Sequence, residues 1–300
     1  MEPALMITTD IRGEVRADEP MSRHCSWRAG GRADRFVKPA DIEDLKTMLR
    51  SLDEDEPCMW IGLGSNTLFR DGGYRGTVIT VQGVLNRMEM LSDDTVYVGA
   101  GMPDAKLARF CKRHDLFGAE WFAGIPGLIG GALAMNAGAW GGETWEHVIS
   151  VDTIDRNGDI RTRAADEYEV GYRSVNGPEG EWFIGSTMRF ETDMDPADVI
   201  DIKTLLEKRA ASQPTGTANG GSVFRNPEGD HAARLIESCG LKGTRIGGAV
   251  ISEKHANFII NDRAASASDI EALIELARER VKQQHGVDLH REVKLVGDAL

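Results

Sequence analysis

Residues 124–142 constrain the fold most, because this glycine run holds seven glycines among nineteen residues and no charged side chain. Glycine lets the backbone reach positive φ and lets another surface approach the chain closely. The run is too small in volume for an ordinary core helix and too apolar for a solvated linker. We interpret it as a backbone cradle for a large phosphorylated ligand, with Asn136 as its one amide side chain. The alternative is a glycine-rich turn between two elements.

Length and charge narrow the class of protein. The 300 residues suffice for two or three compact domains. A net charge of −13 disfavours binding to nucleic acid or anionic lipid. The first 20 residues lack the apolar stretch of a signal peptide, and no apolar run approaches the length of a membrane span. We therefore expect a cytoplasmic protein without membrane contact, and a monomer.

Cysteine and histidine spacing gives no sign of a disulfide framework or a metal site. The four cysteines form no CxxC pair, and their irregular spacing predicts free thiols in a reducing compartment. The seven histidines form neither an HExxH motif nor a His/Cys cluster of zinc spacing. We predict no metal.

Hydrophobic periodicity predicts an α+β protein in three parts, bounded at 1–82, 83–200 and 201–300. Residues 1–20 read as a loose lead-in. Alternation around Asn157 and Gly158 predicts a hairpin. Capping residues and apolar spacing predict helices, and short apolar runs predict strands. The expected helices are 42–52, 103–111, 196–211, 231–239 and 268–283. The expected strands are 35–37, 58–64, 77–81, 95–98, 148–154, 160–163, 181–190, 223–224, 249–251, 257–261 and a last one through 293.

A second glycine motif, the Gly-Ser-Asn turn (residues 62–66), lies at the end of the strand predicted at 58–64. The Rossmann fingerprint would need glycine in place of Thr67 and a helix after it, so this turn does not match it. No segment matches a P-loop. The free backbone amides of the turn, with Ser65 and Asn66, can still bind phosphate oxygens. Two separate turns of this kind fit one diphosphate-containing cofactor.

Five motifs in this order resemble the UDP-N-acetylenolpyruvoylglucosamine reductase family over nearly the whole chain, from about residue 22 to 296. They are the Gly-Ser-Asn turn, the glycine run, Tyr172-Arg173, the block Gly-Gly-Ser-Val-Phe-Arg-Asn-Pro ending at Pro227, and Lys254-His-Ala-Asn-Phe258. The compact length resembles the shorter, type II form of the family. Two positions depart from the family pattern. Leu128 replaces a usual Thr or Ser, and Trp140 replaces a common Tyr.

The resemblance implies a fold and a set of site residues. The fold is a two-domain FAD-binding unit of the vanillyl-alcohol-oxidase/PCMH type, followed by a C-terminal α+β substrate-binding domain. Non-covalent FAD would be held by Gly62, Gly64, Ser65, Asn66, Gly124, Pro126, Gly127, Gly130, Gly131, Asn136, Ala137 and Gly138. Substrate would be bound by Tyr172, Arg173, Asn226 and Lys254. The catalytic residues would be Arg173, Ser222 and Glu292.

The resemblance also implies the reaction. NADPH would reduce FAD, and the flavin N5 would pass hydride to C3 of UDP-N-acetylglucosamine enolpyruvate. Arg173 and Glu292 would stabilise the enolate-like species, and Ser222 would protonate C2. Arginine suits the substrate carboxylate because its planar fork stays charged. From charge alone, Arg225, Lys242, Arg245 and Lys254 are candidates to meet the UDP diphosphate.

Two alternative functions stay open. One is an FAD-dependent sugar or alcohol oxidase with the same cofactor-binding fold. Covalent flavin attachment is disfavoured because residues 59–110 contain no His or Cys. The other is a non-catalytic nucleotide-sugar sensor, which the joint presence of Arg173, Ser222 and Glu292 disfavours.

Overall fold

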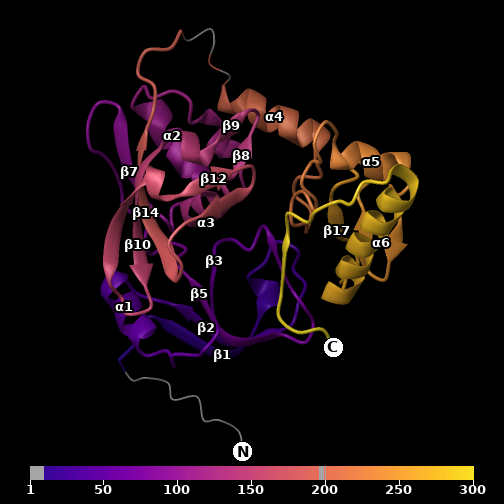
Figure 1. Ribbon diagram of the computed structural model, residues 1–300, viewed down its shortest axis with the longest axis horizontal. Coiled ribbons are helices and arrows are strands. Elements are labelled where there is room, and N and C mark those ends of the chain that lie inside the picture. The colour runs from indigo at the N-terminus through magenta and orange to yellow at the C-terminus, as the bar shows by residue number, and fades with distance from the viewer. Residues whose placement is uncertain (1–9, 196–198, 200) are drawn as a thin grey trace, which may run out of the picture. The chain divides into compact units, whose positions relative to one another are not determined.

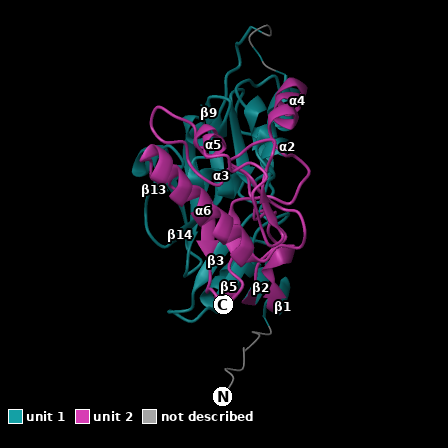
Figure 2. Ribbon diagram, turned by 90° about the vertical axis from the view of Figure 1, so that its right-hand side faces the viewer, with its two compact units in different colours: residues 1–17, 35–62, 76–202 teal, residues 18–34, 63–75, 203–300 magenta. Residues whose placement is uncertain are grey.

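The structure is a computed structural model that describes residues 10–195, 199 and 201–300. The chain forms two compact units, each assembled from several segments (Figure 2). Unit 1 comprises residues 1–17, 35–62 and 76–202, and unit 2 comprises residues 18–34, 63–75 and 203–300. The strands β1 (Glu14–Pro20), β2 (Arg32–Lys38) and β5 (Tyr74–Thr80) run across the boundaries between these segments.

Unit 1 is built around a five-stranded antiparallel sheet in the order β11-β10-β14-β7-β6 (Figure 1). The helices α2 and α3 bury Leu107, Ile129 and Leu133 in the same apolar cluster as Val96, Val98 and Met188 of the sheet. The strands of this sheet are β6 (Met88–Met90), β7 (Thr95–Gly99), β10 (Val148–Asp155), β11 (Ile160–Ala164) and β14 (Glu181–Arg189). The helices are α2 (Asp104–Arg113) and α3 (Ile129–Met135).

A second apolar cluster of unit 1 surrounds α1 (Ile42–Arg50), which buries Leu45, Met48 and Leu49. The strand β3 (Cys58–Ile61) pairs in parallel with β5, Cys58 facing Thr77. The sheet order here is β1-β2-β5-β3. Short elements complete the unit: η2 (Glu120–Gly124), β8 (Gly138–Ala139), β9 (Gly142–Glu143), η3 (Thr144–Glu146), η4 (Ala165–Glu167), β12 (Glu169–Gly171) and β13 (Ser174–Asn176).

Unit 2 has its own core around the long helix α6 (Ala267–His285), which buries Ile270, Leu273 and Ile274. Trp27 is fully buried in that core, and its Nε1 donates to the Ile259 carbonyl at 2.8 Å. The remaining elements are η1 (Met21–Arg23), β4 (Thr67–Phe69), α4 (Ile202–Ser212), α5 (Ala232–Ser238), β15 (Arg245–Ile246), β16 (Ala249–Ile251), β17 (Ile259–Asn261) and β18 (Lys294–Val296). Of these, β15, β16 and β17 form a sheet, and β18 pairs in parallel with β4.

Local sequence signals placed several element ends correctly. The Asp41 side chain accepts from Asp44 N at 2.9 Å and begins α1, as an N-cap should. Ser266 and Asp269 form a capping box at the start of α6, and Gly286 ends this helix with φ 70°. The predicted hairpin is confirmed, because Ile154 pairs with Ile160 across a turn that contains Gly158.

Other predictions need correction. Residues 14–20 form strand β1 within the expected loose lead-in, and the glycine run contains helix α3. In the helix expected at 196–211, apolar spacing predicts Leu205 and Leu206 on the buried face, but Leu206 is 37% exposed. Of residues 223–224 only Phe224 pairs, in an isolated bridge with Arg291, and the last strand begins at Lys294, one residue after the predicted Val293. The helix expected from 196 is described from Ile202, and residues 196–198 and 200 lie outside the described part of the chain.

Candidate active site

The glycine run in unit 1 is compact because most of its glycines adjoin other parts of the protein. A Cβ added to Gly127 would lie 2.5 Å from Asp104 Oδ2, and one added to Gly142 would lie 2.5 Å from Trp121 Nε1. A Cβ on Gly124 would overlap the Trp140 ring, and one on Gly138 would overlap the Gly142 carbonyl. Packing within the protein alone therefore requires glycine at these four positions, and the predicted contacts of Gly124, Gly127 and Gly138 with FAD stay predictions.

Two glycines of the run do leave open space. A Cβ added to Gly131 or Gly141 would meet nothing within 4 Å, and Gly131 is exposed on α3. The Nε1 donor of Trp121 is buried without a partner among the described residues. An open backbone surface of this kind fits a large cofactor such as FAD. Leu128, the departure from the family pattern, is buried and lies in ordinary contact distance of a Cβ built on Gly62.

Asn136 organises the end of the glycine run. It is 1% exposed and ends α3 in the left-handed region, with φ 45°. Its Nδ2 donates to Glu143 Oε2 at 2.7 Å and to the Gly171 carbonyl at 3.2 Å, while its Oδ1 accepts from Trp145 N at 3.1 Å. The amide thus ties three segments of unit 1 together, and its predicted contact with FAD stays a prediction.

Arg173 lies in the turn between β12 and β13, with φ 54°. Its guanidinium donates to the carbonyls of Asn136 at 3.1 Å and Gly138 at 2.6 Å. It also lies 5.2 Å from the ring centroid of Tyr172, a side chain that is 48% exposed. These two hydrogen bonds orient the guanidinium beside the glycine run. Glu143 is a member of this cluster that sequence reasoning missed.

The Gly-Ser-Asn turn is shaped within unit 2 from Gly64 onward. Gly64 has φ 61°, and a Cβ there would overlap the His24 carbonyl, so glycine is required. The Gly64 carbonyl accepts from Ser26 N at 3.1 Å. The Asn66 Nδ2 donates to the Glu292 carbonyl at 3.1 Å. Strand β4 follows the turn in place of a helix, which confirms that this is no Rossmann motif.

Unit 2 brings the two remaining candidates for catalysis together. Phe224 and Arg291 form an antiparallel bridge, and Arg225 N donates to the His290 carbonyl at 2.9 Å. The Val223 carbonyl accepts from both Glu292 N, at 2.8 Å, and Val293 N, at 3.4 Å. Two successive donors on one carbonyl are the signature of a β-bulge, which redirects side chains locally. Ser222 and Glu292, 70 positions apart in sequence, thus lie on directly paired backbone segments.

The four predicted diphosphate contacts in unit 2 differ in what they contact. Lys242 pairs with Glu237 at 2.7 Å, Arg245 pairs with Asp262 at 2.6 Å, and the Lys254 ammonium donates to the Ala210 carbonyl. The Nε of Arg225 is instead buried without a partner among the described residues. Asn226, a predicted substrate contact, accepts from Ala232 N at 3.1 Å at the start of α5. Among the described residues, Arg225 is therefore the cation of this set whose Nε hydrogen-bonding capacity is left unused.

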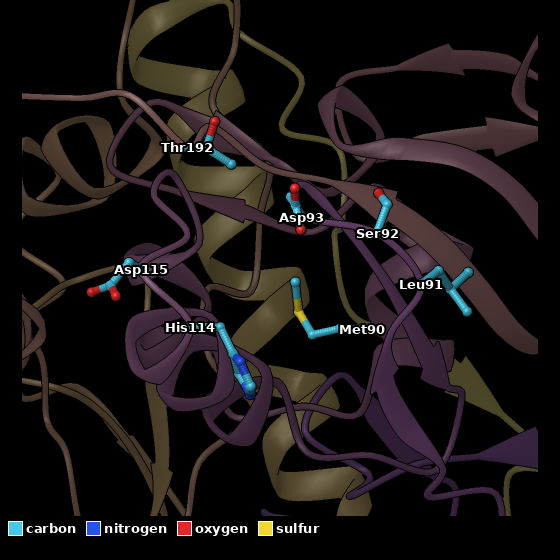
Figure 3. Close-up of a pocket in the computed structure, with 7 residues that line it drawn as sticks. All are labelled: Met90, Leu91, Ser92, Asp93, His114, Asp115 and Thr192. Atoms are coloured by element: carbon cyan, nitrogen blue, oxygen red, sulfur yellow. The ribbon is translucent and has the colours of Figure 1, made fainter.

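A separate hollow of about 610 Å³ lies on unit 1. Figure 3 shows its lining side chains spread around the opening, with His114 and Asp115 at the end of α2 and Asp93 after β6. It includes none of the predicted site residues. Among the described residues, no group of three or more His, Cys, Asp or Glu is arranged to hold a metal ion. No described helix is long and apolar enough to cross a membrane.

Comparison with known proteins decides the family. The chain is 54% identical to a UDP-N-acetylenolpyruvoylglucosamine reductase of Legionella pneumophila (strain Corby) over 97% of its own length and 95% of the relative. The chain belongs to the UDP-N-acetylenolpyruvoylglucosamine reductase family. A reductase of Alkalilimnicola ehrlichii is also 54% identical, over 96% of both chains. The crystal structure of the family's reductase from Thermus caldophilus matches with a TM-score of 0.76 and 29% identity, covering 95% of this chain and 99% of that one.

Two domain matches agree with this family. The family's C-terminal domain matches residues 213–296, and an FAD binding domain matches residues 33–163. The predicted fold class is confirmed, and this member of the reductase family is an FAD-dependent oxidoreductase. The FAD match includes the Gly-Ser-Asn turn and the glycine run. The three-part division at 82/83 and 200/201 stays a prediction.

Substitution of Gly131 tests whether FAD lies against the glycine run. We expect Gly131→Ala to weaken FAD binding about tenfold or more, because a methyl group would occupy the backbone surface that a cofactor approaches. The apoprotein should keep or slightly gain stability, since alanine is favoured over glycine in a helix by about 1 kcal/mol. Titration of apoprotein with FAD, followed by flavin fluorescence, measures the affinity.

The matched control is Ala134→Gly, a change in the opposite direction at another exposed position of α3. It should lower apoprotein stability and leave FAD affinity nearly unchanged. Equal FAD affinity of Gly131→Ala and the unmodified protein would show that the cofactor does not contact this face of α3.

Proposed function

We propose that this chain catalyses the NADPH-dependent, FAD-mediated reduction of UDP-N-acetylglucosamine enolpyruvate to UDP-N-acetylmuramate, a step of peptidoglycan precursor synthesis. The observation that carries the proposal is the pairing of the segment after Ser222 with the segment that contains Glu292. Family membership supports the reductase activity. Bound FAD supplies the two-electron chemistry that transfers hydride from the nicotinamide to C3 of the substrate.

The protein's part in this reaction is to bind, polarise and protonate. Hydride addition at C3 of the enol ether places negative charge on C2 and its carboxylate. Arg173 bears a full positive charge and is oriented by two carbonyls, so it suits that carboxylate. Fixed charge aimed at developing charge is worth several kcal/mol in transition-state stabilisation.

Ser222 is proposed as the proton donor to C2. Its hydroxyl is half-buried and has no hydrogen-bond partner among the described residues, so its proton is available to a ligand. A neutral hydroxyl is a weak acid, and it can protonate only a strongly basic carbon such as this one. Glu292 is proposed to help Arg173 stabilise the same species. Arg225 is proposed to meet the UDP diphosphate.

An anaerobic half-reaction experiment tests the function. NADPH should bleach the yellow enzyme, and UDP-N-acetylglucosamine enolpyruvate added afterwards should restore the oxidised spectrum with formation of UDP-N-acetylmuramate. A reduced enzyme that stays bleached with this substrate contradicts the proposal. Rapid reoxidation by air, with a sugar or alcohol as reductant, would point to the oxidase alternative.

A further inference from the structure

Asn257 is a buried polar residue that the proposed reaction does not use. It is 3% exposed. Its side chain makes two hydrogen bonds to a single residue: Nδ2 donates to the Phe224 carbonyl at 2.8 Å, and Oδ1 accepts from Phe224 N at 3.0 Å. A side-chain amide with both ends bonded to one backbone residue fixes that residue in position and orientation.

The backbone of Asn257 makes a further hydrogen bond next to Ser222. Val223 N donates to the Asn257 carbonyl at 2.9 Å. That N–H belongs to the peptide plane that joins Ser222 to Val223, so the bond restrains rotation at Ser222. The Val223 carbonyl in turn accepts from Glu292 N at 2.8 Å. Asn257 is therefore bonded directly to the residues that connect Ser222 with Glu292.

The loop that holds Asn257 is itself well ordered by hydrogen bonds. Ser252 Oγ accepts from Lys254 N at 3.1 Å and from His255 N at 3.2 Å. Ser252 N donates to the Phe258 carbonyl at 2.8 Å, which closes the loop. Ser252 is 2% exposed. Because the loop is closed, the Asn257 side chain is held in one place. Its two hydrogen bonds therefore fix the position of Phe224.

We propose that Asn257 is a positioning residue that holds the Ser222 hydroxyl in line for proton transfer and holds Glu292 at its side. The inference rests on the proposed function. Asn257 does not contact the reacting atoms and acts through Phe224 and Val223. Misplacement of a reacting group by about 1 Å costs on the order of 100-fold in rate. Loss of Asn257 should therefore slow the step that uses Ser222 and spare the step that does not.

The test compares both half-reactions in Asn257→Ala holoenzyme. Reduction of the flavin by NADPH should stay within about twofold, and reoxidation by the enolpyruvyl substrate should fall about 10- to 100-fold. The solvent isotope effect on reoxidation should rise, because proton transfer becomes rate-limiting. Leu273→Ala, a cavity in the same core of unit 2, is the control for destabilisation alone and should alter neither half-reaction below its unfolding temperature.

Asn257→Asp gives a second variant with a pH signature. Ionised aspartate still accepts from Phe224 N but cannot donate to the Phe224 carbonyl. Protonated aspartate can make both bonds, so reoxidation should recover as the pH is lowered. His255, two residues away, titrates with a pKa lowered by burial, so the unmodified enzyme is scanned in parallel. Absence of acid rescue, with a profile that matches the unmodified enzyme, would overturn the inference.

A double-mutant cycle separates this inference from the proposed function. If Asn257 acts through Ser222 and Glu292, then Asn257→Ala should add less than its full effect to the defect of Ser222→Ala, while fully multiplicative effects would overturn the positioning role. Failure of Ser222→Ala to slow reoxidation would instead overturn the assigned role of Ser222. Equal slowing of both half-reactions by Asn257→Ala would show a general structural role and overturn the inference.

Discussion

Replacing Ser222 with alanine is expected to slow reoxidation of the reduced enzyme by enolpyruvyl substrate about 10²- to 10⁴-fold, the usual contribution of a positioned general acid. Reduction of the flavin by NADPH should keep its rate, because no proton from Ser222 is needed to accept hydride from the nicotinamide. The physical reason is the environment of the hydroxyl. It is half-buried, has no described hydrogen-bond partner, and lies on backbone that is fixed by the paired segment around Glu292.

Stopped-flow absorbance under anaerobic conditions measures the two half-reactions separately. Ser238→Ala is a suitable control, because Ser238 is also in unit 2 and its hydroxyl bonds to the Leu235 carbonyl and His285, away from the predicted site residues. It should leave both rates unchanged. Fast reoxidation of Ser222→Ala would mean that Ser222 is a turn residue and that another group protonates C2.

Much of the fold follows from signals that act within a few residues. The apolar residues of α1 recur at helical spacing behind the Asp41 cap, and the hairpin of β10 and β11 follows from Asn157-Gly158. The same reasoning missed β1, because its alternation of charged and apolar residues is weak and the strand is defined by pairing with β2. It also missed α3, whose small side chains pack because Gly130 lies close against Ala100.

The sequence predicts residues for the candidate site but not their organisation. The family resemblance implies roles for Arg173, Ser222 and Glu292, and these roles stay predictions. Only the folded chain shows that Asn136 and Gly138 orient Arg173, or that Glu292 pairs with Val223. Glu143 and Asn257 make hydrogen bonds to other segments, and no local pattern distinguishes them from surface or turn residues. Asn257 lies inside the run 254–258 that resembles the family, which was the one available signal.

Asp104 is expected to limit stability at neutral pH, because folding there requires the carboxyl to take up a proton, so Asp104→Asn should raise the free energy of unfolding by about 1–3 kcal/mol near pH 7, at about 1.4 kcal/mol for each unit of difference between the pH and the unfolded pKa that is relieved. Asp104 is fully buried at the start of α2, and neither carboxyl oxygen has a partner among the described residues. Burial raises the pKa of Asp104 well above its usual range, and no charged group offsets it. Asparagine has the same shape and needs no proton to stay neutral.

Asp44 is the other fully buried aspartate among the described residues of unit 1, and its hydrogen-bond partners shift its pKa in the opposite direction. Burial alone would raise its pKa, but the N–H groups of Ala40, Arg12 and Gly13, each at 2.8 Å, hold the pKa of Asp44 below its usual value. The two carboxyl groups therefore change the free energy of unfolding with pH in opposite directions. Asp44 stabilises the fold above its unfolded pKa, and this contribution is lost as the pH falls through the lower folded value.

For Asp104 the dependence of stability on pH has the opposite sign. Below the unfolded pKa of about 3.9 the carboxyl is neutral in both states, so it opposes folding least. As the pH rises from there to the raised folded pKa, the unfolded chain releases a proton that the folded chain keeps, and stability falls. The gain from Asp104→Asn should accordingly be absent near pH 4 and grow toward neutral pH.

Thermal unfolding of the apoprotein across pH 4–8, repeated with excess FAD, measures this difference as a shift of a few degrees in Tm. Asp44→Asn is the matched control and should lose stability at neutral pH, because it removes a carboxylate that accepts three backbone hydrogen bonds. A stability gain for Asp104→Asn that does not vary with pH would mean that Asp104 does not change protonation on unfolding. A loss that grows toward neutral pH would mean that the carboxyl is ionised and stabilised in the folded protein.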